Sequence, residues 1–335
     1  MFLSNPPQVP GLQAFRQRYR HYHSPLEKRI EEPEIDCGQV KCNGVFGTLI
    51  DNNSYRFYKG EIKPLQTYDQ TIEYLNVICN SDGYLYPPQE VMVQIDGKTG
   101  GFTGIEMPRS WKVASKFPLF STHQLTAEGM ESKDEFRKGL GAFILGLFSA
   151  LFETRLQFHG WLIDSKVKLE KEFRNIHFSS KEVESFLSAA INSWENWPAK
   201  VRLEMLNILN LFSKIGSYSA TWENFTAAYL VVDGCFSIYK KLFRLKCNDK
   251  AQFQKVCEHF QIPFDKTAVD EIYRLRNDLF HSIKWDQGLF GFATGNGISR
   301  VSDLEKLSLR IIVGLCGYQS EFLKTSWTGN ASERL

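Results

Sequence analysis

The spacing of hydrophobic and polar residues changes near residue 130, and this change divides the chain into two predicted regions. Between about residues 38 and 120, β-branched and aromatic residues gather in short runs separated by Asn, Asp, Gly and Pro. These runs predict a small, mostly antiparallel β unit, preceded by a polar, basic lead-in arm. The predicted strands are Val45–Ile50, Tyr55–Ile62, Ile72–Cys79 and Val91–Ile95.

Beyond residue 130 the apolar residues recur at helical spacing. Ser179 and Glu182 are typical of a capped helix start. The pattern predicts helices over Lys133–Leu151, Lys181–Asn192, Pro198–Lys214, Trp222–Leu245, 267–284 and 303–322, with a polar connection over 246–267 and a loop over 285–302. We therefore predict an α+β fold, with a β-rich N-terminal domain over residues 1–130 and an α-helical region over residues 131–335.

The helix predicted over residues 267–284 carries the most informative residues of the chain. Its apolar residues form one stripe at three- and four-residue steps: Ile272, Leu275, Leu279 and Ile283. Asn277 and His281 are four residues apart and project together beside this stripe. Arg276 lies about 100° from Asn277 around the helix axis, so its long side chain can reach the same place. The sequence therefore predicts a polar cluster of Arg276, Asn277 and His281.

An Arg followed four to six residues later by His is a short pattern that also arises by chance. Two further matches, Arg16 with His21 and Arg18 with His23, lie in the basic arm. That arm has no sustained apolar periodicity, so we interpret it as solvated. The helical context is what distinguishes Arg276 and His281 from these matches.

Composition places few limits on the function. The formal net charge is +2 and the pI is about 8.1, so any contact with RNA requires a local basic patch. One such cluster, Lys240, Lys241 and Arg244, lies in the last turns of the long predicted helix over Trp222–Leu245. These three residues are the candidate RNA-binding residues.

The cysteines and apolar runs indicate a reduced, cytoplasmic protein without a metal site or cofactor. The seven cysteines include no Cys-x-x-Cys pair, so neither a zinc ribbon nor a disulfide scaffold is expected. The longest apolar run, residues 140–152, is too short to span a bilayer, and no secretory signal is evident. The segment Asp96–Gly101 has the residue types of a phosphate loop in the wrong order, and we interpret it as a hairpin turn.

A long helix, a connection, an Arg-Asn-x-x-x-His helix, a glycine-bearing loop and a final helix together resemble the HEPN superfamily. Arg276, Asn277 and His281 match its motif, and Asp233 falls where related families often carry an acid. The resemblance covers about residues 215–325. It is greatest to Apea-like HEPN proteins, which join a β-rich N-terminal region to such a domain. Ile283 stands where a tyrosine marks one toxin branch, which argues against that branch.

The resemblance implies a metal-independent endoribonuclease, acting as a homodimer through the HEPN domain in a toxin or antiviral-defence system. RNA supplies its own nucleophile, the ribose 2′-hydroxyl, so cleavage needs proton transfer and charge stabilisation. His281 would transfer protons, Arg276 would stabilise the added negative charge, Asn277 would orient a phosphate or His281, and Asp233 would support them. The expected products are a 2′,3′-cyclic phosphate and a 5′-hydroxyl.

Two alternatives remain open at the level of the sequence. The chain can be a catalytically silent module of the same fold that binds a protein or senses a ligand. Arg276 can also form a structural ion pair with Asp278 or another acid, with His281 a satisfied histidine at a helix end. The sequence identifies neither an RNA substrate nor a regulating inhibitor or trigger.

Overall fold

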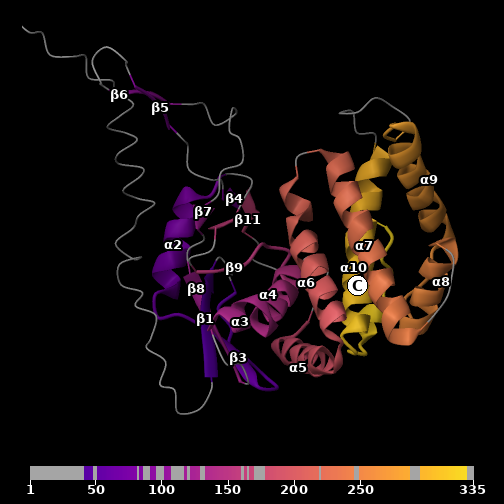
Figure 1. Ribbon diagram of the computed structural model, residues 1–335, viewed down its shortest axis with the longest axis horizontal. Coiled ribbons are helices and arrows are strands. Elements are labelled where there is room, and N and C mark those ends of the chain that lie inside the picture. The colour runs from indigo at the N-terminus through magenta and orange to yellow at the C-terminus, as the bar shows by residue number, and fades with distance from the viewer. Residues whose placement is uncertain are drawn as a thin grey trace, which may run out of the picture.

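A computed structural model shows a small antiparallel sheet joined to a layer of packed helices (Figure 1). It describes residues 41–47, 51–80, 83–85, 91–95, 102–106, 117–118, 121–128, 133–159, 162–163, 166–169, 178–218, 220–244, 249–286 and 295–329. The α+β class predicted from the sequence is therefore confirmed. The basic arm, with Arg16, Arg18, His21 and His23, lies outside the described residues.

The main sheet has five strands in the order β2-β3-β8-β1-β9, and each neighbouring pair is antiparallel. Its strands are β1 (Lys41–Gly47), β2 (Tyr55–Phe57), β3 (Gly60–Pro64), β8 (Ser121–Glu128) and β9 (Gln157–Phe158). Strand β9 lies beyond residue 130 in the sequence and still pairs with β1. The sheet therefore includes chain from both sides of the predicted domain boundary.

Three two-stranded ladders complete the strands of the described residues. They are β4 (Tyr84–Leu85) with β11 (Val167–Lys168), β5 (Val91–Ile95) with β6 (Phe102–Glu106), and β7 (Phe117–Pro118) with β10 (Leu162–Ile163). Strand β5 has the predicted bounds. Asp96–Gly101, the predicted hairpin turn, lies outside the described residues, between two strands that pair antiparallel.

Two strand predictions are wrong. The run Ile72–Cys79 lies in helix α2 (Tyr68–Ile78), because Tyr68, Thr71 and Leu75 are buried at three- and four-residue steps. The run Tyr55–Ile62 is two strands, β2 and β3, joined by a tight turn in which Lys59 has a φ of 61°. Over so few residues, the spacing of apolar side chains does not distinguish a strand from a helix, or one strand from a hairpin.

Most of the helices cover residues 133–315: α3 (Lys133–Lys138), α4 (Leu140–Leu151), α5 (Ser180–Asn196), α6 (Ala199–Lys214), α7 (Thr221–Phe243), α8 (Asp249–Phe260), α9 (Lys266–Ser282) and α10 (Gly295–Leu315). Short 3₁₀ turns occur at η3 (Ile215–Ser217) and η4 (Glu321–Lys324). Helices α5, α6, α7 and α9 confirm the predicted ones. The capped start is also confirmed, because the Ser179 hydroxyl and the Glu182 carboxylate cap the first turn of α5 reciprocally.

Three helix predictions need correction. The helix predicted over Lys133–Leu151 is interrupted at Gly139, between α3 and α4. The polar connection predicted over 246–267 contains α8, which is held by its buried Phe253, Val256 and Phe260. The final helix begins at Gly295 rather than at residue 303 and ends at Leu315. Gly297 lies inside this helix, and a side chain is excluded there because a Cβ would stand 2.7 Å from the Trp285 ring.

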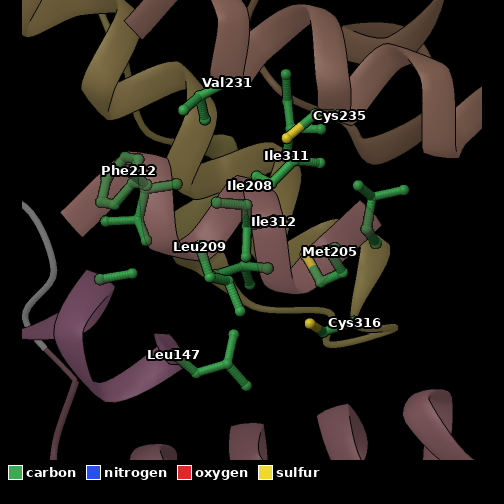
Figure 2. Close-up of a cluster of buried hydrophobic side chains, with 14 of the residues drawn as sticks. Leu147, Met205, Ile208, Leu209, Phe212, Val231, Cys235, Ile311, Ile312 and Cys316 are labelled. Carbon is green, nitrogen blue, oxygen red and sulfur yellow. The ribbon is translucent and has the colours of Figure 1, made fainter. Parts of the chain in front are cut away.

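The hydrophobic core is continuous from Tyr55 in the sheet to Trp327 near the C-terminus. Its centre lies where α4, α6, α7 and α10 meet (Figure 2). Figure 2 labels side chains from each of these helices: Leu147, Met205, Ile208, Leu209, Phe212, Val231, Cys235, Ile311 and Ile312. Apolar burial of this extent is the main stabilising contribution to such a fold.

The segment after α10 returns to the loop that precedes α9. The buried guanidinium of Arg310 donates to the Thr325 carbonyl at 3.1 Å and to the Ser326 carbonyl at 2.9 Å. The indole of Trp327 donates to the Pro263 carbonyl at 2.7 Å. The bonds from Arg310 hold the last described residues against α10, and the bond from Trp327 holds them against the loop before α9.

Candidate functional site

Helix α9 positions the candidate residues and is well anchored at both ends. The Asp265 carboxylate accepts a hydrogen bond from the Ala268 amide at 3.0 Å and caps the first turn. The predicted core stripe is confirmed at Ile272, Leu275 and Leu279, which are buried, whereas Ile283 is 78% exposed. The helix ends at Ile283, whose φ of 51° is left-handed, so His281 lies in its last turn.

The structure brings Arg276, Asn277 and His281 together. Nη1 of Arg276 donates to Oδ1 of Asn277 at 2.9 Å and lies 2.8 Å from Nε2 of His281. Asn277 and His281 are exposed, whereas Arg276 is half-buried. The guanidinium also lies over the Phe280 ring, with its central carbon 5.7 Å from the ring centroid. Phe280 was not among the residues predicted from the sequence, although its position four residues after Arg276 places it on the same helix face.

The contact between Arg276 and His281 constrains the state of the imidazole. An arginine has only donors, so Nε2 must accept, which requires a neutral ring with its proton on Nδ1. The arrangement therefore holds a permanent cation against the basic nitrogen of an exposed imidazole. It can attract an anion and, once the anion engages the arginine, it can offer Nε2 as a proton acceptor.

The predicted alternative of an ion pair between Arg276 and Asp278 does not occur. Asp278 lies 3.6 Å from Nη1 of Arg274 instead, at an exposed i, i+4 position. Among the described residues Arg276 forms no salt bridge. Its charge is thus not neutralised by a carboxylate, and its buried Nε has no hydrogen-bond partner in the described part of the chain.

The aromatic and apolar residues around the motif fix the end of α9 against α7 and α10. The Trp285 ring is buried and packs against Phe225 at 5.2 Å between centroids. The Asp286 carboxylate accepts from the Gly297 amide of α10 at 3.0 Å. Large apolar side chains are exposed on α7 (Leu230, and Phe243 at its far end), on α10 (Ile298) and near the end of α9 (Phe280 and Ile283).

Asp233 and the basic cluster are not joined to the motif by any contact within the described residues. Asp233 is exposed on α7 and makes no hydrogen bond or ion pair there. The chain just after α9 contacts the start of α7 through Trp285 and Phe225. Tyr273, earlier in α9, lies beside Phe253, which in turn contacts Phe236 further along α7, so the two helices run antiparallel. Lys240 is therefore about 22 Å further along α7 than Phe225, at 1.5 Å per residue.

The basic cluster lies at the far end of α7, where Lys241 is paired. Nζ of Lys241 lies 2.5 Å from the Glu204 carboxylate of α6. Arg244 ends α7 in the left-handed region, with a φ of 53°, and is exposed. The structure therefore places Lys240, Lys241 and Arg244 apart from Arg276 and His281.

Within the described residues, no group of three or more His, Cys, Asp or Glu side chains is arranged to hold a metal ion. In the same part of the chain, none of the helices is both long and apolar enough to cross a membrane. Comparisons with protein-family models, with curated proteins and with solved structures found no match.

Proposed function

We propose that the chain is a metal-independent endoribonuclease whose active site contains Arg276, Asn277 and His281. The observation that supports this most directly is the 2.8 Å contact between Nη1 of Arg276 and Nε2 of His281 at an exposed helix end. An unneutralised guanidinium beside a neutral imidazole supplies both charge stabilisation and a proton acceptor. The HEPN resemblance of residues 215–325 leads to the same chemistry.

The proposed reaction begins when a phosphate of RNA replaces His281 as a partner of Arg276. A guanidinium binds a phosphate through charge-assisted, bidentate hydrogen bonds, which are stronger than a bond to a neutral imidazole. Nε2 of His281 is then released and takes the proton of the 2′-hydroxyl. The 2′-oxygen attacks phosphorus, the bond from phosphorus to the 5′-oxygen breaks, and the 5′-oxygen receives a proton. The products are a 2′,3′-cyclic phosphate and a 5′-hydroxyl.

A second imidazole would serve as the acid that protonates the 5′-oxygen, and we propose that a second copy of the chain supplies it. The exposed Leu230, Phe280, Ile283 and Ile298 lie on the elements around the motif. Covering these side chains in a symmetric dimer would bring two motif helices together. In this proposal the protein is a cytoplasmic toxin or antiviral-defence effector.

A second candidate function is a catalytically silent module that binds a partner through this same surface. The position of the basic cluster favours it, because Lys240, Lys241 and Arg244 lie at the opposite end of α7 from the motif. Arg274, the nearest other arginine on α9, is already beside Asp278. An RNA strand at the motif would thus meet few additional cations.

Cleavage of RNA in excess EDTA, followed by end-group analysis, separates the two functions. We expect the wild-type protein to leave cyclic phosphates, and the Arg276→Ala and His281→Ala variants to leave the RNA intact. Arg274→Ala is the matched control, since it removes the same residue type as Arg276→Ala from α9 outside the motif. Cleavage that persists in His281→Ala would refute the proposed ribonuclease site.

A further inference from the structure

Phe243, at the last position of α7, exposes an aromatic ring at the end of that helix opposite to the motif. Its side chain is 39% exposed, although phenylalanine is among the residues most often buried in a fold. The ring of His259 on α8, which is also exposed, lies beside it, with centroids 4.3 Å apart and planes tilted by 54°. The two helices thus present a pair of adjacent, accessible aromatic rings.

The two accessible rings rest on buried aromatic side chains. The Phe243 ring lies 4.9 Å from the Tyr239 ring and 6.1 Å from the Phe260 ring, between centroids. The His259 ring contacts the same two rings, at 5.3 and 4.9 Å. Tyr239 and Phe260 are 1% and 2% exposed and belong to the core. The accessible rings are therefore held in place, and covering them with a ligand costs little conformational entropy.

Three cations flank this pair of rings without a carboxylate partner. On α7, Lys240 precedes Phe243 by three residues, which places both on one helix face, and Arg244 follows Phe243 directly. On α8, Lys255 precedes His259 by four residues and shares its face. Arg244 and Lys255 are exposed, and Lys240 is half-buried. Within the described part of the chain, none of these three side chains forms an ion pair or a hydrogen bond.

The acids near this surface leave the three cations unneutralised. The Glu204 carboxylate of α6 is paired with Nζ of Lys241, at 2.5 Å. Glu258, the neighbour of His259 on α8, accepts a hydrogen bond from the Gln254 amide at 2.7 Å, which is a neutral partner. The positive charges therefore outnumber the negative ones among the described side chains of this surface, and a polyanion is attracted to it.

We propose that this surface binds single-stranded RNA, whose bases stack on the exposed rings while its phosphates lie against the three cations. We call it the stacking surface: Lys240, Phe243, Arg244, Lys255 and His259. Fixed aromatic rings beside unpaired cations match the flat bases and the charged backbone of a single strand. A duplex keeps its bases stacked on one another, so it offers no free base face to these rings.

The stacking surface is distant from the motif. Phe243 lies eighteen residues beyond Phe225 on α7, which is about 27 Å at 1.5 Å per residue, whereas the motif lies near Phe225. An RNA strand at the motif must therefore extend along α7 to reach the stacking surface, which adds affinity for long substrates only. This inference rests on RNA as the ligand in the proposed function, but the binding does not require cleavage.

Fluorescence anisotropy of labelled oligouridine, titrated in EDTA with the full-length His281→Ala protein, tests the stacking surface. This variant lacks the proposed proton acceptor, so the RNA stays intact while its binding is measured. With an oligomer of about twelve nucleotides, we expect the further change Phe243→Ala to weaken binding roughly tenfold, because base stacking is lost. Tyr58→Ala is the matched control, since it removes a 47% exposed aromatic ring from the turn between β2 and β3. We expect it to leave the affinity unchanged.

A charge reversal and a duplex test the other two parts of the proposal. Lys255→Glu is expected to weaken binding roughly tenfold at low salt, whereas Lys181→Glu, at an exposed position on α5, is expected to leave it unchanged. A duplex of the same length is expected to bind more weakly than the single strand and to be insensitive to Phe243→Ala.

The possible results distinguish the stacking surface from the ribonuclease site. Equal affinities in Phe243→Ala and Tyr58→Ala would overturn the stacking surface even if RNA binds elsewhere on the protein. Absence of RNA binding at about 100 μM protein, where even non-specific contacts are detected, would overturn it as a whole. Single-strand binding that depends on Phe243 and Lys255 would support it, also if the wild-type protein cleaves no RNA, a result that contradicts only the proposed ribonuclease.

Discussion

The ring of Trp285 packs against the ring of Phe225 with centroids 5.2 Å apart, and this contact joins the chain just after α9 to the first turns of α7. Trp285 is fully buried, although the neighbouring Lys284 and Ile283 are exposed. The last turn of α9, with His281, is therefore positioned by an aromatic anchor three to four residues beyond it.

Trp285→Ala removes the anchor and is expected to lower the free energy of unfolding by about 3–5 kcal/mol, the range for deleting a large buried aromatic side chain. Urea denaturation measures this change. Phe264→Ala is the control, because its side chain is 37% exposed. If both variants lose the same stability, Trp285 does not anchor the helix end.

Arg276→Lys keeps the positive charge but replaces the planar guanidinium that contacts both Asn277 and His281. A lysine ammonium cannot reproduce that fork, so we expect the single-turnover rate of RNA cleavage to fall by about 10²-fold or more. Arg274→Lys makes the same exchange two residues away, and we expect it to cleave at close to the wild-type rate. A wild-type rate in Arg276→Lys would show that charge alone suffices.

Acid is expected to destabilise the sheet through His123. Burial lowers the pKa of this fully buried histidine to about 4, from an ordinary value of 6.5. Between pH 6.5 and 4, His123 is therefore protonated in the unfolded chain but neutral in the folded chain. The stability from neutral His123 is complete above pH 6.5 and is lost as the pH falls towards 4. Between pH 7.5 and 5.0 the loss is roughly 2 kcal/mol.

The His123→Gln variant tests this pH dependence, since glutamine is polar but does not titrate. We expect its free energy of unfolding to fall less between pH 7.5 and 5.0 than that of the wild type, by the same roughly 2 kcal/mol. Urea titrations of both proteins at the two pH values give the comparison. Parallel losses in the two proteins would assign the acid sensitivity to other groups.

Gly234→Ala is expected to destabilise the protein although alanine is the better helix former. A Cβ at this position of α7 would lie 2.9 Å from Cγ1 of Ile208 on α6, so the Ile208 side chain or the packing of the two helices must shift. Overpacking of this kind costs about 1–3 kcal/mol, more than the gain of about 1 kcal/mol in helix propensity. Gly216→Ala is the matched control, since no atom lies within 4 Å of its added Cβ. Thermal unfolding of both variants decides the sign.

The sequence predicts the motif helix well because its information is local. The stripe of Ile272, Leu275 and Leu279 is buried as its spacing requires, and the four-residue step from Asn277 to His281 brings both side chains to one guanidinium. The absence of a pair between Arg276 and Asp278 was not predictable. It depends on Arg274, one turn before Asp278, which reaches that carboxylate instead.

Features that depend on distant parts of the chain escape the sequence pattern. The sequence of α8 is typical of a polar connection. The helix packs against the fold through Phe253, which contacts Phe236 of α7 and Tyr273 of α9. The glycines at the start of α10 are typical of a loop. In the structure the Trp285 ring occupies the space beside Gly297, which a larger residue would fill. The separation of Lys240 from His281 follows from the antiparallel directions of α7 and α9. The relative direction of two helices cannot be inferred from a local sequence pattern.

The hydrogen bond from the Trp327 indole joins residues that are far apart in the order of synthesis. Trp327 leaves the ribosome well after α9, yet it donates to the Pro263 carbonyl just before that helix. A nascent chain that ends between His281 and Trp327 thus lacks this hydrogen bond before the start of α9. The support of the motif helix is therefore complete only after synthesis has passed Trp327, although the helix itself is made earlier.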